Sequence, residues 1–218
     1  MKGIRQLTVD DAAEYHKVLI AGYAENKNYP ISFDAINFSQ EESRAWILKY
    51  PVFGLYVDGS LVCSISFRMP WIPKATPDVY PHIAHFVTAP EHKGKGYARE
   101  VLAEAEDLLR NVYKTPAVTL GTAAEHLWLA KMYEGFAFKE YKRKQLPGKV
   151  HITIFFKKYC SYQDYCVFKD SWNKCKNKKS RIKGCDSFLY PVSIYNYFVT
   201  TLRSTGILAS TASPLIIF

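Results

Sequence analysis

The sequence lacks any run of the roughly 20 apolar residues that a helix needs to cross a lipid bilayer. Its first residues, MKGIRQLTVDD, have no apolar stretch after the basic residues, so they do not resemble a secretory signal peptide. The apolar segment GILASTASPLIIF near the C-terminus is short and interrupted by Ser, Thr and Pro. These absences predict a cytoplasmic protein.

Metal-binding cysteine patterns are also missing. The 218 residues contain five cysteines, and the four that follow Cys63 match no CxxC zinc motif in their spacing. Cys63 itself stands alone within a predicted strand. We therefore expect reduced cysteines and no metal site.

Positive charge is in excess, and much of that excess lies late in the chain. Residues 1–158 hold 21 Lys and Arg against 17 Asp and Glu, and residues 159–218 hold 8 against 3. The run KCKNKKSRIK is more typical of a solvated segment than of a nucleic-acid surface. We predict a folded domain over residues 1–158 and a basic, Cys- and Tyr-rich extension over 159–218. Its composition is compatible with a small added module, a disordered extension or a loosely packed segment.

Hydrophobic periodicity predicts helices in several parts of residues 1–158. Residues 8–11 and 39–42 have the form of capping boxes, and apolar residues at helical spacing follow each of them. The segment between these helices, residues 22–38, has no clear period and is expected to be a loop. A strongly amphipathic helix is predicted after Gly96. Its apolar face comprises Val101, Leu102, Ala105, Leu108, Leu109 and Val112.

Other segments alternate with period two and predict strands. Apolar residues alternate on both sides of Asp58-Gly59, a pair that favours a tight hairpin turn. HIAHFVT and AVTLGTA are further strands, HLWLAKMYEGF is a helix, and a closing hairpin surrounds Pro147-Gly148. The order β-α-α-β-β-β-α-β-α-β-β predicts an α/β (α+β) fold with a mixed central sheet and helices packed on it.

Gly94 and Gly96 lie in the turn between a predicted strand and the amphipathic helix. The first turn of a helix has unpaired N–H groups and the positive end of the macrodipole, and glycines let a pyrophosphate approach the main chain. A Walker loop would need GxxxxGK[ST], and a dinucleotide fingerprint would need glycine or alanine in place of Arg99. The turn therefore predicts another kind of phosphate site, with a simple helix cap as the alternative.

Two motifs here resemble those of the GNAT superfamily of N-acetyltransferases. Residues 93–98, KGKGYA, match [RQ]xxGx[GA], with Lys93 where the family has Arg or Gln. Residues 130–138, AKMYEGFAF, match its helix-to-strand segment, with Ala137 at the position of a glycine. The resemblance covers residues 1–158 and implies a mostly antiparallel sheet and acetyl-CoA as cosubstrate. It also implies direct acetyl transfer to a primary amine of a small molecule or peptide.

The same resemblance implies which residues bind the cosubstrate. Backbone N–H groups from Gly94 to Ala98 would hold the pyrophosphate, and the main chain of Val87 would pair with the pantetheine arm. The implied cosubstrate-binding residues are Val87, Lys93, Gly94, Lys95, Gly96, Tyr97, Ala98 and Arg99. A non-catalytic acyl-CoA-binding module with the same turn is the alternative function, and a homodimer is compatible with either.

Two catalytic residues are predicted. Tyr133 matches the family tyrosine that donates a proton to the departing thiolate, although a packed aromatic is the alternative. The acceptor amine, with a pKa near 10.4, must first lose a proton. The strand HIAHFVT has no carboxylate, so His85 is the predicted base, with His82, Glu25 and a water-mediated path left open.

Acceptor specificity in the family comes from the loop at residues 23–38 and from the closing hairpin. An aromatic loop containing Tyr29 and Phe33 favours an apolar amine, whereas Lys142, Arg143 and Lys144 favour an acidic one. The two indications conflict, and ordinary packing explains both.

Overall fold

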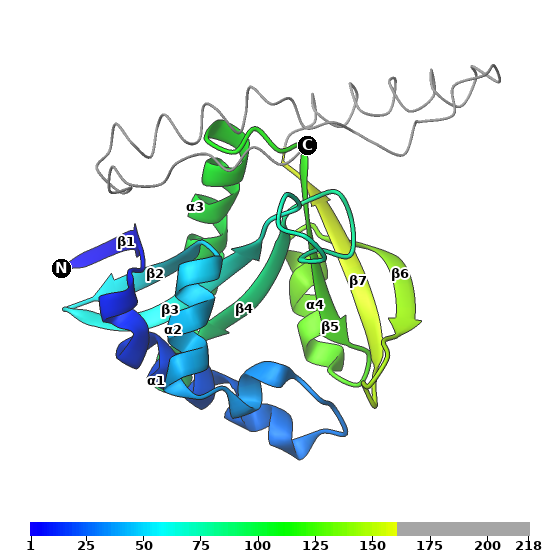
Figure 1. The fold of residues 1–218 in the computed structure, drawn as a ribbon, viewed down its shortest axis with the longest axis horizontal. Coiled ribbons are helices and arrows are strands. Elements are labelled where there is room, and N and C mark those ends of the chain that lie inside the picture. Colours follow the sequence, from blue (N-terminus) through cyan, green and yellow to red (C-terminus); the bar gives the residue numbers. More distant parts are fainter. Residues whose placement is uncertain (161–218) are drawn as a thin grey trace. The chain divides into compact units, whose positions relative to one another are not determined.

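The structure, a computed structural model, describes residues 1–160 of the chain. They form a seven-stranded sheet with the order β1-β2-β3-β4-β5-β7-β6 (Figure 1). Neighbouring strands are antiparallel except β4 and β5, which are parallel. The predicted mixed, mostly antiparallel sheet with flanking helices is confirmed. The predicted extension lies, beyond Cys160, outside the described residues.

The order of helices and strands along the chain is the predicted one. The strands are β1 (Lys2–Gln6), β2 (Val52–Val57), β3 (Ser60–Arg68), β4 (His82–Thr88), β5 (Ala117–Ala123), β6 (Lys139–Gln145) and β7 (Ile152–Tyr159). The α-helices are α1 (Ala12–Tyr23), α2 (Gln40–Lys49), α3 (Tyr97–Asn111) and α4 (Leu127–Gly135). Short 3₁₀ helices are η1 (Val9–Asp11), η2 (Ala24–Asn28), η3 (Asp34–Asn37) and η4 (Pro90–His92).

Local sequence signals explain where these elements begin and turn. The Ser39 Oγ accepts a hydrogen bond from the Glu42 N–H at 3.1 Å, and the Glu42 carboxylate accepts one from the Ser39 N–H at 2.7 Å. This reciprocal pair starts α2, as the sequence predicts. Asp58 and Gly59 both have positive φ, 50° and 85°, as the tight turn between β2 and β3 requires.

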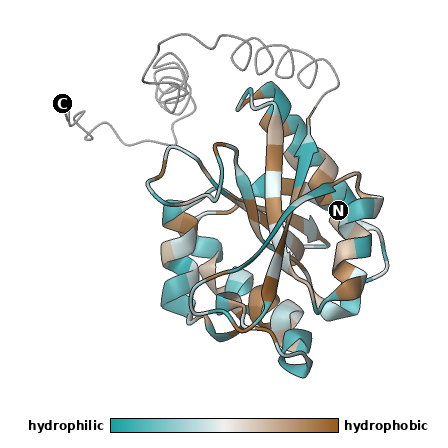
Figure 2. Cartoon of the chain, turned by 90° about the vertical axis from the view of Figure 1, so that its right-hand side faces the viewer, coloured by the Kyte–Doolittle hydropathy of each residue, from teal (hydrophilic) through white to brown (hydrophobic). Residues whose placement is uncertain are grey.

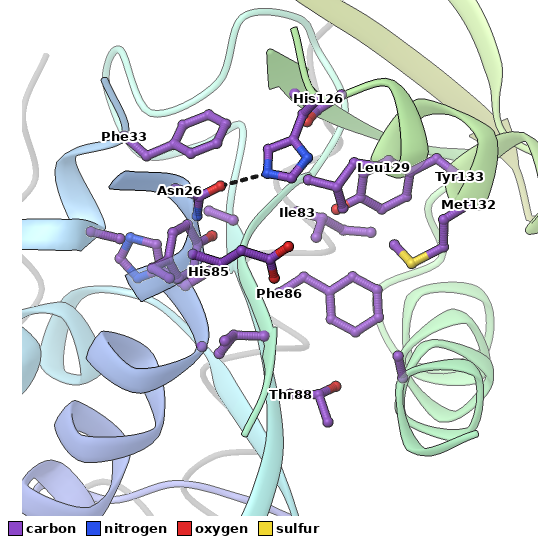
Figure 3. Close-up of a pocket in the computed structure, with 18 of the residues that line it drawn as sticks. Asn26, Phe33, Ile83, His85, Phe86, Thr88, His126, Leu129, Met132 and Tyr133 are labelled. Carbon is purple, nitrogen blue, oxygen red and sulfur yellow. Dashed lines mark hydrogen bonds between the residues drawn. The ribbon is translucent and has the colours of Figure 1, made fainter. Parts of the chain in front are cut away.

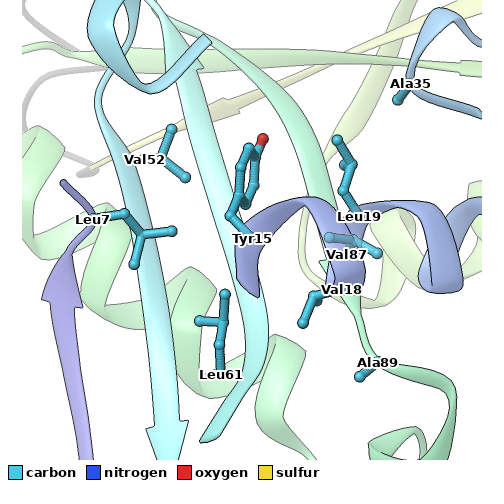
Figure 4. Close-up of a cluster of buried hydrophobic side chains, with 9 residues drawn as sticks. All are labelled: Leu7, Tyr15, Val18, Leu19, Ala35, Val52, Leu61, Val87 and Ala89. Carbon is cyan, nitrogen blue, oxygen red and sulfur yellow. The ribbon is translucent and has the colours of Figure 1, made fainter. Parts of the chain in front are cut away.

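One part of the core lies between α1 and the sheet, and the buried face of α3 forms another part. Helix α1 crosses one face of β3 and β4, and α3 packs behind the sheet against β2, β3 and β4 (Figure 4). The buried cluster on the α1 side comprises Leu7, Tyr15, Val18, Leu19, Ala35, Val52, Leu61, Val87 and Ala89. In Figure 2 the central strands carry most of the hydrophobic residues, and the outward turns of the helices are largely hydrophilic. Helix α1 approaches β4 so closely that a Cβ at Gly22 would lie 1.9 Å from the Val87 Cγ2.

Three details differ from the sequence prediction. The segment expected to be a loop contains η2 and η3, because 3₁₀ turns leave no helical period in a sequence. Val112, predicted on the buried face of α3, is 44% exposed because the helix ends at Asn111. Strand β4 contains a bulge, where His85 has a φ of 48° and the pairing with β3 shifts register. None of the helices in residues 1–160 has the length and apolar content to span a bilayer.

Candidate functional site

A cavity of about 780 Å³ opens where β4, the start of α3, the η2–η3 segment and α4 meet. Figure 3 shows the strand residues Ile83, Phe86 and Thr88 between two walls. Asn26 and Phe33 lie on one side, and His126, Leu129, Met132 and Tyr133 come from the α4 side. Among the described residues, no group of three or more His, Cys, Asp or Glu forms a metal-binding arrangement.

The turn before α3 forms one end of this cavity. Gly96 is the N-cap of α3 with a φ of 82°, and Gly94 has a φ of 76°. Such conformations strongly favour glycine. Apart from the adjoining residues, no atom of residues 1–160 lies within 4 Å of the position that a Cβ would take at either glycine, so the main chain faces open space there. The unpaired N–H groups of the first helical turn can therefore hold a phosphate group.

Cationic side chains flank the turn. Lys93 forms an ion pair with Glu25 at 2.8 Å, and the Arg99 guanidinium lies 5.0 Å from the centre of the Phe136 ring. Lys95 approaches His92 instead and is not among the residues that line the cavity. The structure brings the other predicted cosubstrate-binding residues together at the cavity wall. These are Val87, Lys93, Gly94, Gly96, Tyr97, Ala98 and Arg99.

Strands β4 and β5 separate along the cavity. They pair only at His82 with Thr119 and at Ile83 with Leu120. Beyond Ile83, the edge of β4 that faces β5 has no partner strand within residues 1–160, and Val87 and Thr88 line the cavity there. This wedge leaves main-chain groups of β4 available to pair with an extended ligand.

His85 lies at the cavity but in an aromatic surrounding. Its Nδ1 shares a hydrogen bond of 2.9 Å with the Tyr15 hydroxyl, and its ring stacks on Trp46 at 4.0 Å between centroids. Burial lowers the pKa of His85 to about 3. At neutral pH the imidazole is therefore uncharged and a weak base, and its predicted role as general base stays a prediction.

Tyr133 lies on α4 with its ring against Phe138 and Phe156, at centroid distances of 6.0 and 6.1 Å. Burial raises the pKa of its hydroxyl, so the group keeps its proton at neutral pH. The side chain lines the cavity, and no hydrogen bond joins its hydroxyl to another of residues 1–160. This arrangement suits a proton donor to a ligand, and the predicted catalytic role stays a prediction.

His126 is a cavity residue that the sequence reasoning missed. Its Nε2–H donates to the Asn26 Oδ1 at 2.8 Å (Figure 3). The Tyr29 ring packs on the imidazole with a centroid distance of 4.3 Å. That hydrogen bond places the proton on Nε2, and the buried Nδ1 has no partner in the described part of the chain. Burial lowers the pKa of His126. His126 comes shortly after the end of β5, which runs parallel to β4. This position in the sequence is the signal that could have identified it as a site residue.

Arg68 was also missed. It is the last residue of β3 and lines the cavity beside His82. Its Nε is buried and has no hydrogen-bond partner among residues 1–160. The sequence gives no local sign of this, because a charged residue at the end of a strand usually faces solvent.

Comparison with known proteins identifies the family. Residues 13–138, more than half of the chain, match the model of the Acetyltransferase (GNAT) family. S-alkylcysteine N-acetyltransferase of Bacillus subtilis (strain 168) is 31% identical over 152 residues, which are 69% of this chain and 85% of that protein. S-(2-succino)cysteine N-acetyltransferase of the same strain is 32% identical over 160 residues, which are 72% of this chain and 96% of that protein.

A solved structure agrees with the fold. The structure of YncA from Salmonella typhimurium with its cofactor acetyl-CoA has a TM-score of 0.56 and 16% sequence identity. The match covers 74% of this chain and 95% of that one. The family model and these relatives are consistent with the glycine turn before α3 and with the wedge between β4 and β5. This chain therefore belongs to the GNAT family of acetyltransferases and is an N-acetyltransferase.

Proposed function

We propose that this N-acetyltransferase moves the acetyl group of acetyl-CoA directly to the amine of an S-substituted cysteine. One observation carries the proposal: the open glycine turn, the unpaired edge of β4 and Tyr133 all line the same cavity. The cytoplasmic location and the homodimer stay predictions.

The cavity fits acetyl-CoA in two respects. The turn from Lys93 to Ala98 presents free N–H groups and positive charge to a pyrophosphate, and the edge of β4 near Val87 offers main-chain groups to a pantetheine arm. Acetyl-CoA supplies a thioester, whose carbonyl carbon accepts the amine. A backbone N–H of the β4 edge can stabilise the negative charge that develops on the carbonyl oxygen.

The acceptor is inferred from the relatives. Two N-acetyltransferases at 31% and 32% identity are named for S-alkylcysteine and S-(2-succino)cysteine. The wall opposite α4 carries Phe33 and Phe38, which can contact an apolar thioether substituent. We therefore propose an S-substituted cysteine as the acceptor.

A base must take a proton from the acceptor, because only the neutral amine attacks the thioester. We propose His126 ahead of His85. The Nδ1 of His126 carries a lone pair with no partner in residues 1–160, and the bond to Asn26 fixes this tautomer. His85 is held by Tyr15 and has a pKa of about 3.

Tyr133 completes the transfer. As the C–N bond forms and the C–S bond breaks, its hydroxyl donates a proton to the departing sulfur. The proton that His126 takes before the attack passes to solvent. The nitrogen loses a second proton as the amide forms, and this proton replaces through solvent the one that Tyr133 gave to sulfur. The net products are therefore the N-acetylated acceptor, free CoA thiol and one proton in solvent. Holding the amine and thioester together supplies much of the rate enhancement.

The test is mass spectrometry of the purified protein incubated with acetyl-CoA and a panel of amines. The panel contains S-methylcysteine, S-(2-succino)cysteine, spermidine and a peptide with a free N-terminus. We expect the two cysteine derivatives to gain one acetyl group. Acetylation of only spermidine or the peptide would contradict the proposed acceptor. Binding of acetyl-CoA without acetylation of any amine would instead favour a non-catalytic module.

A further inference from the structure

The Arg68 side chain is half-buried at the cavity wall without a visible partner. No hydrogen bond or ion pair connects its guanidinium to any other of residues 1–160, and its Nε is fully buried. Burial lowers the pKa of Arg68, but an arginine keeps its charge at neutral pH. Buried charges in proteins are usually paired, so this arginine is arranged to meet a charge that residues 1–160 do not supply.

The position of Arg68 assigns this charge to the acceptor and not to the phosphates. Arg68 pairs with His82 at the beginning of β4, whereas Thr88 at the other end of β4 lies close to the glycine turn. A strand rises roughly 3.3 Å per residue, so these two ends of β4 lie roughly 20 Å apart. Among the described residues that line the cavity, Lys93 and Arg99 are at the phosphate end, and Arg68 is at the other.

Asp34 also lines the cavity, and its negative charge raises the pKa of Arg68. Its carboxylate forms an ion pair with Lys149 and not with Arg68, and its side chain is 79% exposed. Burial lowers the pKa of both His82 and His85, and the positive charge of Arg68 is a further cause in each case. Both imidazoles are therefore uncharged at neutral pH, whereas Arg68 keeps its positive charge at this end of the cavity.

A carboxylate is the group that best fits such a guanidinium. The planar fork of arginine binds the two oxygens of a carboxylate with parallel hydrogen bonds. In an α-amino acid the carboxylate and the amine are attached to the same carbon, so fixing the first also orients the second. We propose that Arg68 binds the α-carboxylate of the acceptor and makes the enzyme selective for amino acids over simple amines. This inference rests on the proposed function and deepens it.

The experiment compares two acceptors that differ only in the carboxylate, S-methylcysteine and 2-(methylthio)ethylamine. We expect the wild-type enzyme to prefer S-methylcysteine by about 10²-fold in kcat/KM, and Arg68→Met to lose that preference through a higher KM. The readout is the ratio of the two kcat/KM values, S-methylcysteine over 2-(methylthio)ethylamine, in each variant. The matched control is Arg143→Met, which removes an exposed arginine that pairs with Glu140 away from the cavity and should keep the preference.

Binding without turnover separates this inference from the proposed function. S-methylcysteine is titrated calorimetrically into protein saturated with free CoA. Binding that requires Arg68, with no acetylation in the wild type, would overturn the proposed function and keep this inference. An equal preference for S-methylcysteine in Arg68→Met and the wild type would overturn this inference alone. If Arg68→Met does not fold, Arg68→Lys is tested in its place. Lysine keeps the positive charge but lacks the planar guanidinium, so we expect the preference for S-methylcysteine to fall about tenfold. An unchanged preference would contradict the proposal.

Discussion

Burial changes the pKa of each side chain on which the proposed proton transfers depend. It raises the pKa of Tyr133 and lowers those of His85 and His126, so at neutral pH all three are uncharged. An uncharged tyrosine can donate a proton, and an uncharged imidazole with a free nitrogen can accept one. The hydrogen bonds then distinguish the two histidines, because Tyr15 occupies the Nδ1 of His85 while Nδ1 of His126 has no partner in residues 1–160.

Tyr133→Phe tests the proton donor. The substitution removes only the hydroxyl, while the ring can still pack against Phe138 and Phe156. We expect kcat to fall by about 10²-fold and the acetyl-CoA affinity to stay the same. Steady-state kinetics and calorimetry measure the two quantities, and unchanged turnover would leave Tyr133 with a packing role.

His126→Gln and His85→Gln test the base by their pH profiles. A base must be unprotonated, so activity is lost as the pH falls through its pKa in the enzyme. The pKa of His126 lies below 6.5, and the acidic fall in kcat should begin there and disappear in His126→Gln, with kcat lower by 10²-fold or more. With a pKa of about 3, His85 should produce no such fall above pH 5. If the acidic fall in kcat instead persists in His126→Gln and disappears in His85→Gln, His85 is the base.

Motif positions were predictable residue by residue, whereas cavity residues without a motif were not. The glycine spacing predicted that Gly94 and Gly96 lie in the turn before α3, where both have positive φ, because a turn depends on local main-chain conformation. His126 and Arg68 reach the cavity through the pairing of β3, β4 and β5. Their roles depend on long-range contacts, which residue spacing does not encode.

Helix α1 and strand β4 pack more closely than any sequence period indicates, and Gly22 makes this possible. A Cβ there would lie 1.9 Å from the Val87 Cγ2 and 3.1 Å from the Thr88 carbonyl oxygen. We expect Gly22→Ala to displace the edge of β4 and lower the free energy of unfolding by about 1–3 kcal/mol. Gly135→Ala in α4 is the control, because no atom lies within 4 Å of its Cβ position. Equal melting temperatures of the two variants would contradict the close packing.

The elements themselves were largely predictable because their signals are local. Capping residues, the Asp58-Gly59 turn and the amphipathic period of α3 all act within a few residues. The bulge at His85 was not predicted, since it arises where the pairing of β3 and β4 shifts register. The separation of β4 from β5, on which the cosubstrate site depends, is likewise a property of the whole sheet.

For the whole chain, the predicted domain boundary at residue 158 stays a prediction, and the end of β7 indicates where to cut the chain for its test. Strand β7 ends at Tyr159, and the Cys160 N–H and C=O bond to the Pro116 carbonyl and the Arg110 side chain at 2.9 and 2.8 Å. We expect a chain that ends at Cys160 to fold and to gain thermal stability with acetyl-CoA, as the full-length protein should. Aggregation of the shorter chain, or the absence of a ligand-dependent shift in its Tm, would place the extension within the catalytic domain.

The central claim is that the turn before α3 binds acetyl-CoA for transfer to an amine. The most direct measurement is calorimetric acetyl-CoA binding, with CoA release in the presence of S-methylcysteine, for Gly96→Ala and Gly59→Ala. Both glycines have similar positive φ, 82° and 85°, and open space at the Cβ position, but only Gly96 lines the cavity. The two substitutions therefore impose similar backbone strain. We predict that Gly96→Ala loses most of its acetyl-CoA affinity and activity while Gly59→Ala keeps both, and equal binding in the two variants would contradict the account.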